Sequence, residues 1–317
     1  YTRYNPVVKS YYNYLTTLKL TKSDVVLITM GPFYLSTLCK LISVEFDCKV
    51  ILDYRDAWST NEFKKPYFNF IESLLKRYTY RRKEKIALKY VAAVTCASSY
   101  ILKGILSLVK FEIPNMVLEN GYDFNIESSY SHKQESKILS IIYPGSILPV
   151  QNIYPFLNAV SELTKTKRSL CEFLFLGTSM NRKMRKELPQ LEHEYFKIIR
   201  KGRVDYNESI DIQKGYDFGF MCRYDEVKGV PSSKLYTFLA LRQPVILYPS
   251  DDDIIEETLR KCNLGLFPKN VKDLKELLIQ LLDSALKSKF QLEANDNIKN
   301  YHRSVQTQKL VQFIINL

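Results

Sequence analysis

The sequence has 317 residues, of which 46 are Lys or Arg and 34 are Asp or Glu, so its formal net charge is +12 and its pI is near 9.2. Apolar residues make up 46% of it, which excludes wholesale disorder, and a chain of this length is expected to form two domains. No apolar run reaches the roughly 18 residues of a membrane-spanning helix, and the N-terminus does not resemble a signal peptide. Because the first residue is Tyr1 and not a methionine, we expect a fragment or a trimmed chain.

The surplus of positive charge indicates an acidic partner, which is nucleic acid, an anionic membrane surface or a phosphorylated small molecule. Only 10 glycines accompany 23 tyrosines, which argues against a Gly- and Arg-rich RNA-binding segment. The six cysteines never form a C-x-x-C pair, and several lie in apolar runs, which is typical of core residues in a reducing compartment. We therefore expect a cytoplasmic protein.

The first part of the chain alternates short apolar runs with longer segments of helical period. Short runs rich in Val and Ile predict buried strands, and apolar residues three or four apart predict helices. The predicted strands are 24–29, 48–53, 91–96 and 116–118. The predicted helices are 33–46, the strongly basic 63–90, and one from Ser98 or Ser99 to Val109. Buried strands separated by helices predict a parallel, doubly wound α/β sheet.

The same rhythm restarts behind a polar segment, 125–137, which has the composition of a linker. The predicted strands of this second part are 140–143, 172–176, 196–200, 218–222 and 244–248, and its predicted helices are 153–163, 233–241 and 304–317. We expect two doubly wound, Rossmann-like domains facing a cleft, the first over 1–130 and the second over 131–303. Ligands of such sheets bind at the carboxyl ends of the strands.

The most distinctive segment places two carboxylates, an arginine and the only tryptophan at the end of a predicted strand. These residues are Asp53, Arg55, Asp56 and Trp58. They are compatible with a functional cluster in which the indole offers a flat face to a sugar ring. They are equally compatible with a structural Asp–Arg ion pair beside a buried tryptophan.

A second segment predicts an anion site at the start of a helix. Ser232 or Ser233 is placed to cap the helix that contains Lys234, so free backbone N–H groups, a hydroxyl and an ammonium would converge at the positive end of the helix dipole. Arg223 follows the preceding strand and is expected to reach the same phosphate. The alternative is an ordinary capped helix with a solvated lysine.

Two further turns are weaker indications. Tyr143-Pro-Gly-Ser146 ends a predicted strand at a point where backbone can approach a ligand closely, and Asn120-Gly-Tyr-Asp123 is typical of a tight turn before the linker. The three histidines are scattered without metal-ligand spacing, so we expect no metal site. The acids of 251–253 are expected to lie at a helix N-terminus.

Taken in order, these segments resemble the GT-B glycosyltransferases, in particular the glycosyltransferase family 4-like enzymes of bacterial polysaccharide assembly. The first two segments, DYRDAW (53–58) and NGYD (120–123), are similar to the D-x-R-D-x-W and N-G-x-D segments of the first domain. The YPGS turn (143–146) is similar to the first strand-turn of the donor domain. DFGFMCR (217–223) and PSSKLYTFLALRQPVI (231–246) resemble its donor-phosphate block.

The resemblance implies transfer of a sugar from a nucleotide-diphosphate sugar to an acceptor hydroxyl, with retention at the anomeric carbon and without a required metal or cofactor. The donor diphosphate would be held by Lys234, Ser233, Ser232, Arg223, Gly145 and Ser146. Asp53, Arg55 and Asp56 would line the cleft from the acceptor domain, with Asp56 contacting the reacting sugar or the acceptor. The terminal helix, 304–317, would pack back on the first domain.

Several positions depart from the family pattern. Thr237 stands on the nucleotide ribose side, where the family often has a glutamate, and Gln243 replaces the usual glycine before P-V-I. The Arg and Lys that often follow the YPGS turn are replaced by Ser146, Gln151 and Asn152. The first domain has about four predicted strands, fewer than a full doubly wound half, so we expect its first strands to be missing.

Two functions therefore remain as hypotheses. One is a glycosyltransferase of surface polysaccharide or glycoconjugate synthesis, whose basic run from Lys64 to Lys89 lies against the anionic inner face of the cell membrane, where a lipid-linked or saccharide acceptor would be met. The other is a non-catalytic, GT-B-like subunit that binds a partner or an anionic membrane. Nucleic acid is not the expected partner, because net charge alone favours it.

Overall fold

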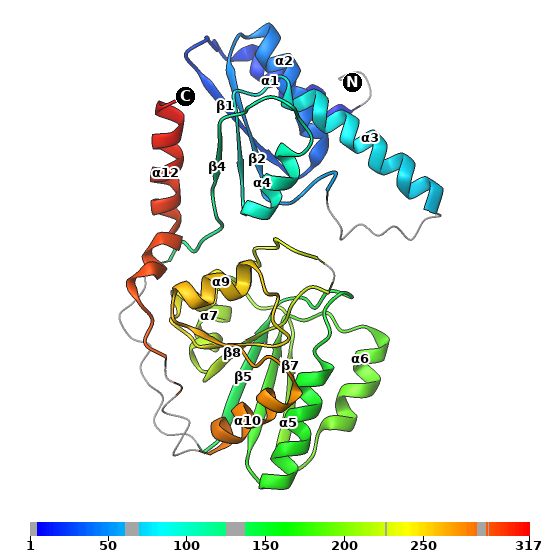
Figure 1. Ribbon diagram of the computed structural model, residues 1–317, viewed down its shortest axis with the longest axis vertical. Coiled ribbons are helices and arrows are strands. Elements are labelled where there is room, and N and C mark those ends of the chain that lie inside the picture. The colour runs from blue at the N-terminus through cyan, green and yellow to red at the C-terminus, as the bar shows by residue number, and fades with distance from the viewer. Residues whose placement is uncertain (1–4, 61–69, 125–136, 226, 284–289, 291) are drawn as a thin grey trace. The chain divides into compact units, whose positions relative to one another are not determined.

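The computed structural model describes residues 5–60, 70–124, 137–225, 227–283, 290 and 292–317. The chain forms two compact units (Figure 1). The first unit comprises Tyr1–Asn120 together with Ser304–Leu317, and the second comprises Gly121–Arg303. Most of the predicted linker lies outside the described residues, and so do Lys64 and Lys65, which begin the basic run.

The first unit is built on a four-stranded parallel sheet with strand order β1-β2-β3-β4. Its strands are β1 (Val25–Met30), β2 (Lys49–Tyr54), β3 (Ala93–Cys96) and β4 (Asn115–Val117). Nearly every residue of β2 and all of β3 are buried, which requires helices on both faces of the sheet and explains the continuous apolar runs in the sequence. Asp53 pairs in register with Thr95, so the polar end of β2 lies beside the end of β3.

Among its described residues, this unit has five helices and one 3-10 turn. They are α1 (Pro6–Thr17), η1 (Phe33–Thr37), α2 (Leu38–Glu45), α3 (Phe70–Leu88), α4 (Ser99–Leu106) and α12 (Arg303–Ile315). The Ser98 hydroxyl accepts a hydrogen bond from Ile101 N–H to cap α4, as the sequence predicts. The Asn5 side chain caps α1, a helix that the sequence does not predict. The core includes Val8 of α1, Ile42 of α2 and Ile101 of α4.

The second unit is built on a six-stranded parallel sheet with strand order β10-β9-β8-β5-β6-β7. Its strands are β5 (Leu139–Pro144), β6 (Cys171–Leu176), β7 (Phe196–Lys201), β8 (Phe218–Met221), β9 (Val245–Leu247) and β10 (Gly265–Leu266). The central strand β5 is buried along its whole length. Since β5 and β8 are neighbours, the loops that follow them meet at one edge of the sheet.

The helices of the second unit complete an aromatic core. They are α5 (Tyr154–Lys167), α6 (Arg182–Glu187), η2 (Leu188–Leu191), α7 (Tyr206–Lys214), α8 (Ser233–Ala240), α9 (Ile254–Lys261), α10 (Val271–Leu282) and η4 (Asp296–Tyr301). The Phe156 ring of α5 stacks on Phe220 of β8, with 4.2 Å between ring centroids. Gly219 leaves room for Phe238 of α8, because a Cβ at residue 219 would lie 2.6 Å from that ring.

The NGYD segment does more than turn the chain toward the linker. Tyr122 forms an isolated parallel bridge with His302, in which Tyr122 N–H donates to Tyr301 O (3.1 Å) and Arg303 N–H donates to Tyr122 O (2.8 Å). A Cβ at Gly121 would lie 2.2 Å from the Tyr301 carbonyl oxygen. The prediction of a simple turn is therefore incomplete, since this glycine allows two distant backbone segments to pair.

All six cysteines are free and buried, as their apolar surroundings in the sequence predict. Burial raises the pKa of the Cys39 and Cys222 thiols to about 12. Cys39, Cys48 and Cys96 belong to the first unit, and Cys171, Cys222 and Cys262 to the second. Thiols this buried and this weakly acidic serve as small core residues.

Candidate functional site

The loop after β5 and the start of α8 form the centre of the candidate site. Gly145 follows β5 with a φ of 79°, a left-handed conformation that glycine adopts without strain. Its N–H donates to Leu176 O (2.7 Å), and the Thr178 hydroxyl donates to its carbonyl oxygen (2.7 Å). A Cβ at residue 145 would lie 3.2 Å from Lys234 Cε, so this glycine lets the lysine lie across the turn.

Lys234 is the cation of the site. It lies in the first turn of α8, and its ammonium donates to the Tyr143 hydroxyl (3.0 Å) and to the Ser146 carbonyl oxygen (2.9 Å). The same nitrogen is 4.4 Å from the centroid of the Tyr143 ring. Burial lowers the pKa of Lys234 from 10.5 to about 8, and the nearby Cys222 acts in the opposite direction. The lysine is therefore half-buried and held by the β5 loop, which differs from the solvated lysine of the alternative interpretation.

Ser232 and Ser233 lie at the N-terminus of α8 in different environments. Ser232 is the N-cap residue and is buried, but its side chain makes no capping hydrogen bond. Its hydroxyl instead interacts with the Tyr224 hydroxyl. Ser233 is exposed. The prediction that a serine hydroxyl caps this helix is thus wrong, although the helix begins where the sequence places it. Leu235 N–H donates to Ser232 O (3.1 Å), and the N–H groups of Ser233 and Lys234 lie at the positive end of the helix dipole.

Arg223 follows β8, and Thr237 lies on α8. The Arg223 guanidinium donates to the Asp225 carboxylate, with 2.9 Å between Nε and Oδ1, and its side chain is 49% exposed. Thr237 lies one turn after Ser233 on α8 and is partly buried. The structure therefore brings Gly145, Ser146 and Lys234 into contact, while Arg223 points its charge at an acid in the same loop.

Gln151 is a residue of the site that the sequence does not reveal as one. Its Oε1 accepts hydrogen bonds from the Tyr143 hydroxyl (3.2 Å) and from Leu148 N–H (3.0 Å), and its Nε2 donates to Cys222 O (3.3 Å). Gln151 thus ties the loop after β5 to the end of β8. Its place after the YPGS turn is the only sequence signal that indicates this role.

In the first unit, the buried Asp53 and the partly buried Arg55 form one hydrogen-bonded network. The Asp53 carboxylate accepts from Arg55 Nε (2.8 Å), from Arg55 Nη2 and from the Thr95 hydroxyl (2.7 Å). Arg55 Nη1 donates to the Leu118 carbonyl oxygen (3.0 Å) and to Asn120 Oδ1 (3.2 Å). These contacts join the ends of β2 and β3 to the segment after β4.

Asp56 and Trp58 have opposite surroundings. Asp56 is exposed just beyond β2, where its carboxylate is accessible to a ligand. Trp58 is 5% exposed and stacks on Phe33, with 5.5 Å between ring centroids and 4° between ring planes. Of the two alternatives for the tryptophan, the core is therefore correct and a stacking face for a sugar is not.

Glu84 of α3 is a buried carboxylate beneath this segment. Its Oε2 accepts from Ser59 N–H (3.1 Å), and it also interacts with the Tyr54 hydroxyl. Burial raises the pKa of Glu84, against the effect of these hydrogen bonds and of Arg81. The group fixes the chain that follows Trp58 to α3 and is closed to a ligand.

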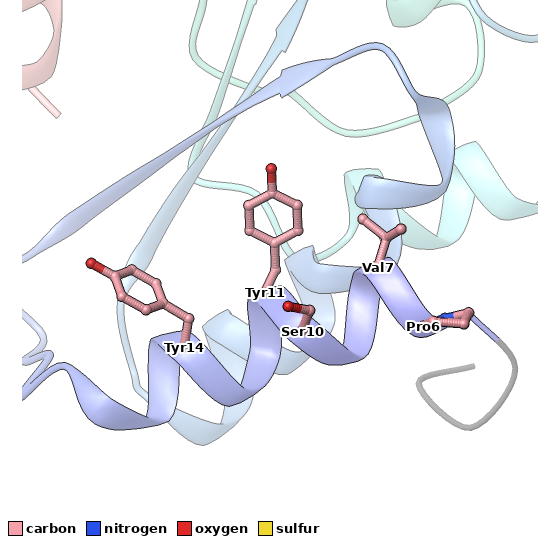
Figure 2. Close-up of a pocket in the computed structure, with 5 residues that line it drawn as sticks. All are labelled: Pro6, Val7, Ser10, Tyr11 and Tyr14. Atoms are coloured by element: carbon pink, nitrogen blue, oxygen red, sulfur yellow. The ribbon is translucent and has the colours of Figure 1, made fainter.

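A separate depression lies on α1 and carries none of the predicted site residues. It is lined by Pro6, Val7, Ser10, Tyr11 and Tyr14, and Figure 2 shows Tyr11 and Tyr14 projecting from the same side of the helix. Its lining contains hydroxyl groups and apolar surface but no carboxylate, ammonium or imidazole.

Within the described part of the chain, no three His, Cys, Asp or Glu side chains group as metal ligands would. Of the acids of 251–253, Asp251 serves α9, because it accepts from Ile255 N–H (2.8 Å) and Glu256 N–H (3.0 Å), whereas the Asp253 carboxylate accepts from Gly229 N–H. No helix among the described residues is long and apolar enough to cross a membrane.

Two compact units, each built on a parallel α/β sheet, are the architecture of the GT-B fold class. The structure thus confirms the predicted fold class, and solved structures support it. No protein-family model matches the chain, and no curated protein sequence matches it.

TarM, HepE and a sucrose-phosphate synthase are among the solved structures with similar folds. TarM aligns with 96% of this chain at 16% identity and a TM-score of 0.65. HepE from Anabaena, in complex with UDP and glucose, aligns with all of it at 11% identity and a TM-score of 0.66. Sucrose-phosphate synthase from Thermosynechococcus elongatus aligns with 98% at 12% identity and a TM-score of 0.67. The chain spans 57% of TarM, 83% of HepE and 77% of the synthase. At these identities the likeness establishes the fold alone.

Proposed function

We propose that the protein is a glycosyltransferase that moves a sugar from a nucleotide-diphosphate sugar to an acceptor hydroxyl. The observation that carries this proposal is the half-buried Lys234 ammonium, which lies between the N-terminus of α8 and the Gly145–Ser146 turn. The GT-B fold supports it, as does the similarity to HepE, which was crystallised with UDP and glucose.

The proposed role of the site is to stabilise the negative charge of the leaving group. Departure of a nucleoside diphosphate from the anomeric carbon places negative charge on the leaving oxygen, which preorganised donors stabilise. Lys234 and the N–H groups at the start of α8 supply such donors, with Ser232, Ser233, Gly145 and Ser146 around them. We propose that this charge serves in place of a metal ion and that the reaction proceeds with retention and without a cofactor. Activity unchanged by EDTA would support metal independence.

On the acceptor side, we assign contact with the reacting sugar or the acceptor to Asp56. Its carboxylate is exposed just beyond the carboxyl end of β2, the end of a parallel strand at which ligands bind. Asp53 and Arg55 are already joined to each other and to β3 and the segment after β4. We therefore give these two residues the task of fixing the loop that carries Asp56.

Nucleotide binding tests the proposal directly. UDP at a hundred times its Kd is expected to stabilise the fold by about 2.7 kcal/mol, which raises the Tm by several degrees. Lys234→Ala is expected to abolish this shift. The matched control is Lys183→Ala, because Lys183 also lies near a tyrosine ring, 5.7 Å from the centroid of Tyr154, and should leave the shift unchanged. Absence of a shift with UDP, GDP, ADP, CDP and dTDP would overturn the proposal.

We further propose that α3 rests on an anionic membrane at the inner face of the cell membrane and brings a lipid-linked acceptor within reach, as in surface polysaccharide synthesis. Leu75, Tyr78 and Ile86 are 61%, 69% and 45% exposed, and they recur at helical spacing on one face. The cations Arg81, Arg82 and Lys85 are exposed on the same helix, and Lys89 is exposed in the turn that follows it. An apolar stripe flanked by cations favours an anionic bilayer surface.

Vesicle flotation distinguishes this surface from general basicity. Replacement of Arg82, Lys85 and Lys89 by Glu is expected to remove binding to vesicles that contain phosphatidylserine. Replacement of the exposed Lys165, Lys167 and Lys183 of the second unit changes the net charge equally and should leave binding intact. Equal loss in both variants would contradict a site on α3.

A second candidate function is a non-catalytic, GT-B-like subunit that binds a partner or an anionic membrane. Thr237 on α8, where related sequences often carry a ribose-binding glutamate, favours it. Nucleotide binding without transfer or hydrolysis of any nucleotide sugar would support this candidate, and turnover would exclude it.

A further inference from the structure

The ammonium of Lys234 has two partners before any ligand is bound, and both come from the segment 143–146. The ammonium nitrogen is 3.0 Å from the Tyr143 hydroxyl oxygen and 2.9 Å from the Ser146 carbonyl oxygen. The Tyr143 side chain is 1% exposed and packs against Phe175 and Phe220. The flexible Lys234 side chain is thereby hydrogen-bonded to the hydroxyl of a buried, closely packed ring.

Tyr143 acts on the lysine as a neutral group. Burial raises the pKa of its hydroxyl well above the ordinary value of 10, so the oxygen that accepts from Lys234 remains a protonated phenol. Of the described residues, Cys222 is the titratable group whose charge acts on Lys234, and its pKa is also raised by burial. The ion pair of Arg223 with Asp225 lies in the loop that follows. No carboxylate of the described chain therefore neutralises the lysine, and its charge is kept for a ligand.

The Tyr143 hydroxyl is itself fixed. It lies within hydrogen-bond distance of Gln151 Oε1 (3.2 Å), and Gln151 Nε2 donates to Cys222 O (3.3 Å). A chain of hydrogen bonds thus runs from α8 through β5 and its loop to the end of β8. The Tyr143 hydroxyl also lies 3.1 Å from the Ser146 carbonyl oxygen, so its one proton is directed to these two acceptors and its lone pairs are left for the Lys234 ammonium.

We propose that Tyr143, supported by Gln151, is a positioning residue that holds the Lys234 ammonium at the place where the donor diphosphate binds. This inference rests on the proposed function of the site and deepens it. Long charged side chains lose rotamer freedom when they bind a ligand. A lysine already held by a neutral hydroxyl loses less rotamer freedom, and an arriving diphosphate replaces the ammonium's contact with the Ser146 carbonyl oxygen.

Tyr143→Phe tests the contact while preserving the ring and its packing. By calorimetry at pH 7.5, the variant is expected to bind UDP about tenfold more weakly, as expected for the loss of one hydrogen bond to a charged group. UDP affinity of the wild type should fall as the pH rises through about 8, where Lys234 loses its proton. Loss of the hydroxyl removes an interaction that favours the ammonium, so in the variant this fall should begin at a lower pH.

Tyr154→Phe is the matched control, because Tyr154 is also a second-unit tyrosine with a lysine near its ring and should bind UDP as the wild type does. A titration of Lys234 by NMR with ¹³C-labelled lysine needs no ligand. A lower pKa for Lys234 in Tyr143→Phe is expected, and an unchanged pKa would overturn the inference even if no nucleotide binds. If the wild type binds UDP and Tyr143→Phe binds it equally well or more tightly, positioning by Tyr143 is also overturned, while the proposed function stands.

Discussion

Asp53 and Arg55 are joined by two hydrogen bonds between one carboxylate and one guanidinium, with 2.8 Å between Arg55 Nε and Asp53 Oδ2. Asp53 is 4% exposed and also accepts from the Thr95 hydroxyl. Such bidentate pairs have fixed geometry. The pair therefore holds the ends of neighbouring strands together, and the exposed Asp56 lies on the loop that it anchors.

Asp53→Asn is expected to destabilise the first unit by about 3 kcal/mol, because it leaves the partly buried Arg55 without its counter-charge. Trp58 is the only tryptophan and lies in this unit, so its fluorescence during urea unfolding reports the change. Wild-type stability in Asp53→Asn would contradict a structural role for the pair.

Asp56→Asn is expected to behave in the opposite way. The side chain is exposed, and a surface substitution of this kind changes stability by less than about 0.5 kcal/mol. If Asp56 contacts the reacting groups, sugar transfer should fall by about a hundredfold or more, while the Tm shift with UDP is retained. Full activity in a transfer assay would remove Asp56 from the site.

Glu84→Gln is expected to change how the stability of the first unit depends on pH. Burial raises the folded-state pKa of Glu84 above its ordinary value, so the folded state holds this proton more tightly than the unfolded state. The stability that this provides is full below the unfolded pKa and is lost as the pH rises through the folded pKa. A glutamine cannot titrate and retains an acceptor for Ser59 N–H. The Tm of the variant relative to the wild type should therefore increase between pH 4 and pH 7, and a constant difference would contradict this.

Gly145→Ala is expected to weaken both stability and UDP binding. The residue has a φ of 79°, and the added methyl group would lie 3.2 Å from Lys234 Cε. The backbone cost is about 1–2 kcal/mol, and the displaced lysine should weaken the binding of UDP. Gly202→Ala is the control, since a Cβ there meets nothing within 4 Å. Equal UDP affinities in the two variants would argue against a close approach of the lysine to this turn.

Gly121→Ala is expected to open the bridge between Tyr122 and the segment before α12. The methyl group would lie 2.2 Å from a backbone oxygen, that of Tyr301, and a backbone atom cannot move aside as a flexible side chain does. Trypsin should then cleave after Arg303 faster than in the wild type. Unchanged cleavage, with Gly202→Ala as reference, would show that the bridge tolerates the methyl group.

The sequence predicts the sheets well because buried parallel strands are continuous apolar runs, and β2 and β5 lie within a residue or two of their predicted bounds. It does not predict α1, whose exposed Tyr11 and Tyr14 obscure an apolar stripe. The core position of Trp58 also escapes prediction, because its stacking partner Phe33 belongs to η1, 25 residues earlier (58 − 33).

In the candidate site too, local features can be predicted from the sequence and contacts between distant residues cannot. Lys234 is identifiable from its place at a helix start, since capping and the helix dipole act over a few residues. Its actual partners, Tyr143 and Ser146, are 91 and 88 residues away in the chain, and no local pattern connects them. Ser232 fits a capping residue by type, but the nearby Tyr224 hydroxyl takes its side chain. A tertiary contact of this kind, and not local propensity, determines which partner the side chain bonds.

Because the cysteines are buried, the rate at which their thiols react reports how often the core of each unit unfolds. Three thiols lie in each unit, and each is at most 4% exposed, so an alkylating reagent can modify them only when the surrounding core separates. Mass spectrometry of the modified peptides would then give an opening rate for each unit from one sample of the unaltered chain. Addition of UDP should slow labelling of Cys222, which adjoins Lys234, while Cys39 in the other unit serves as the internal reference.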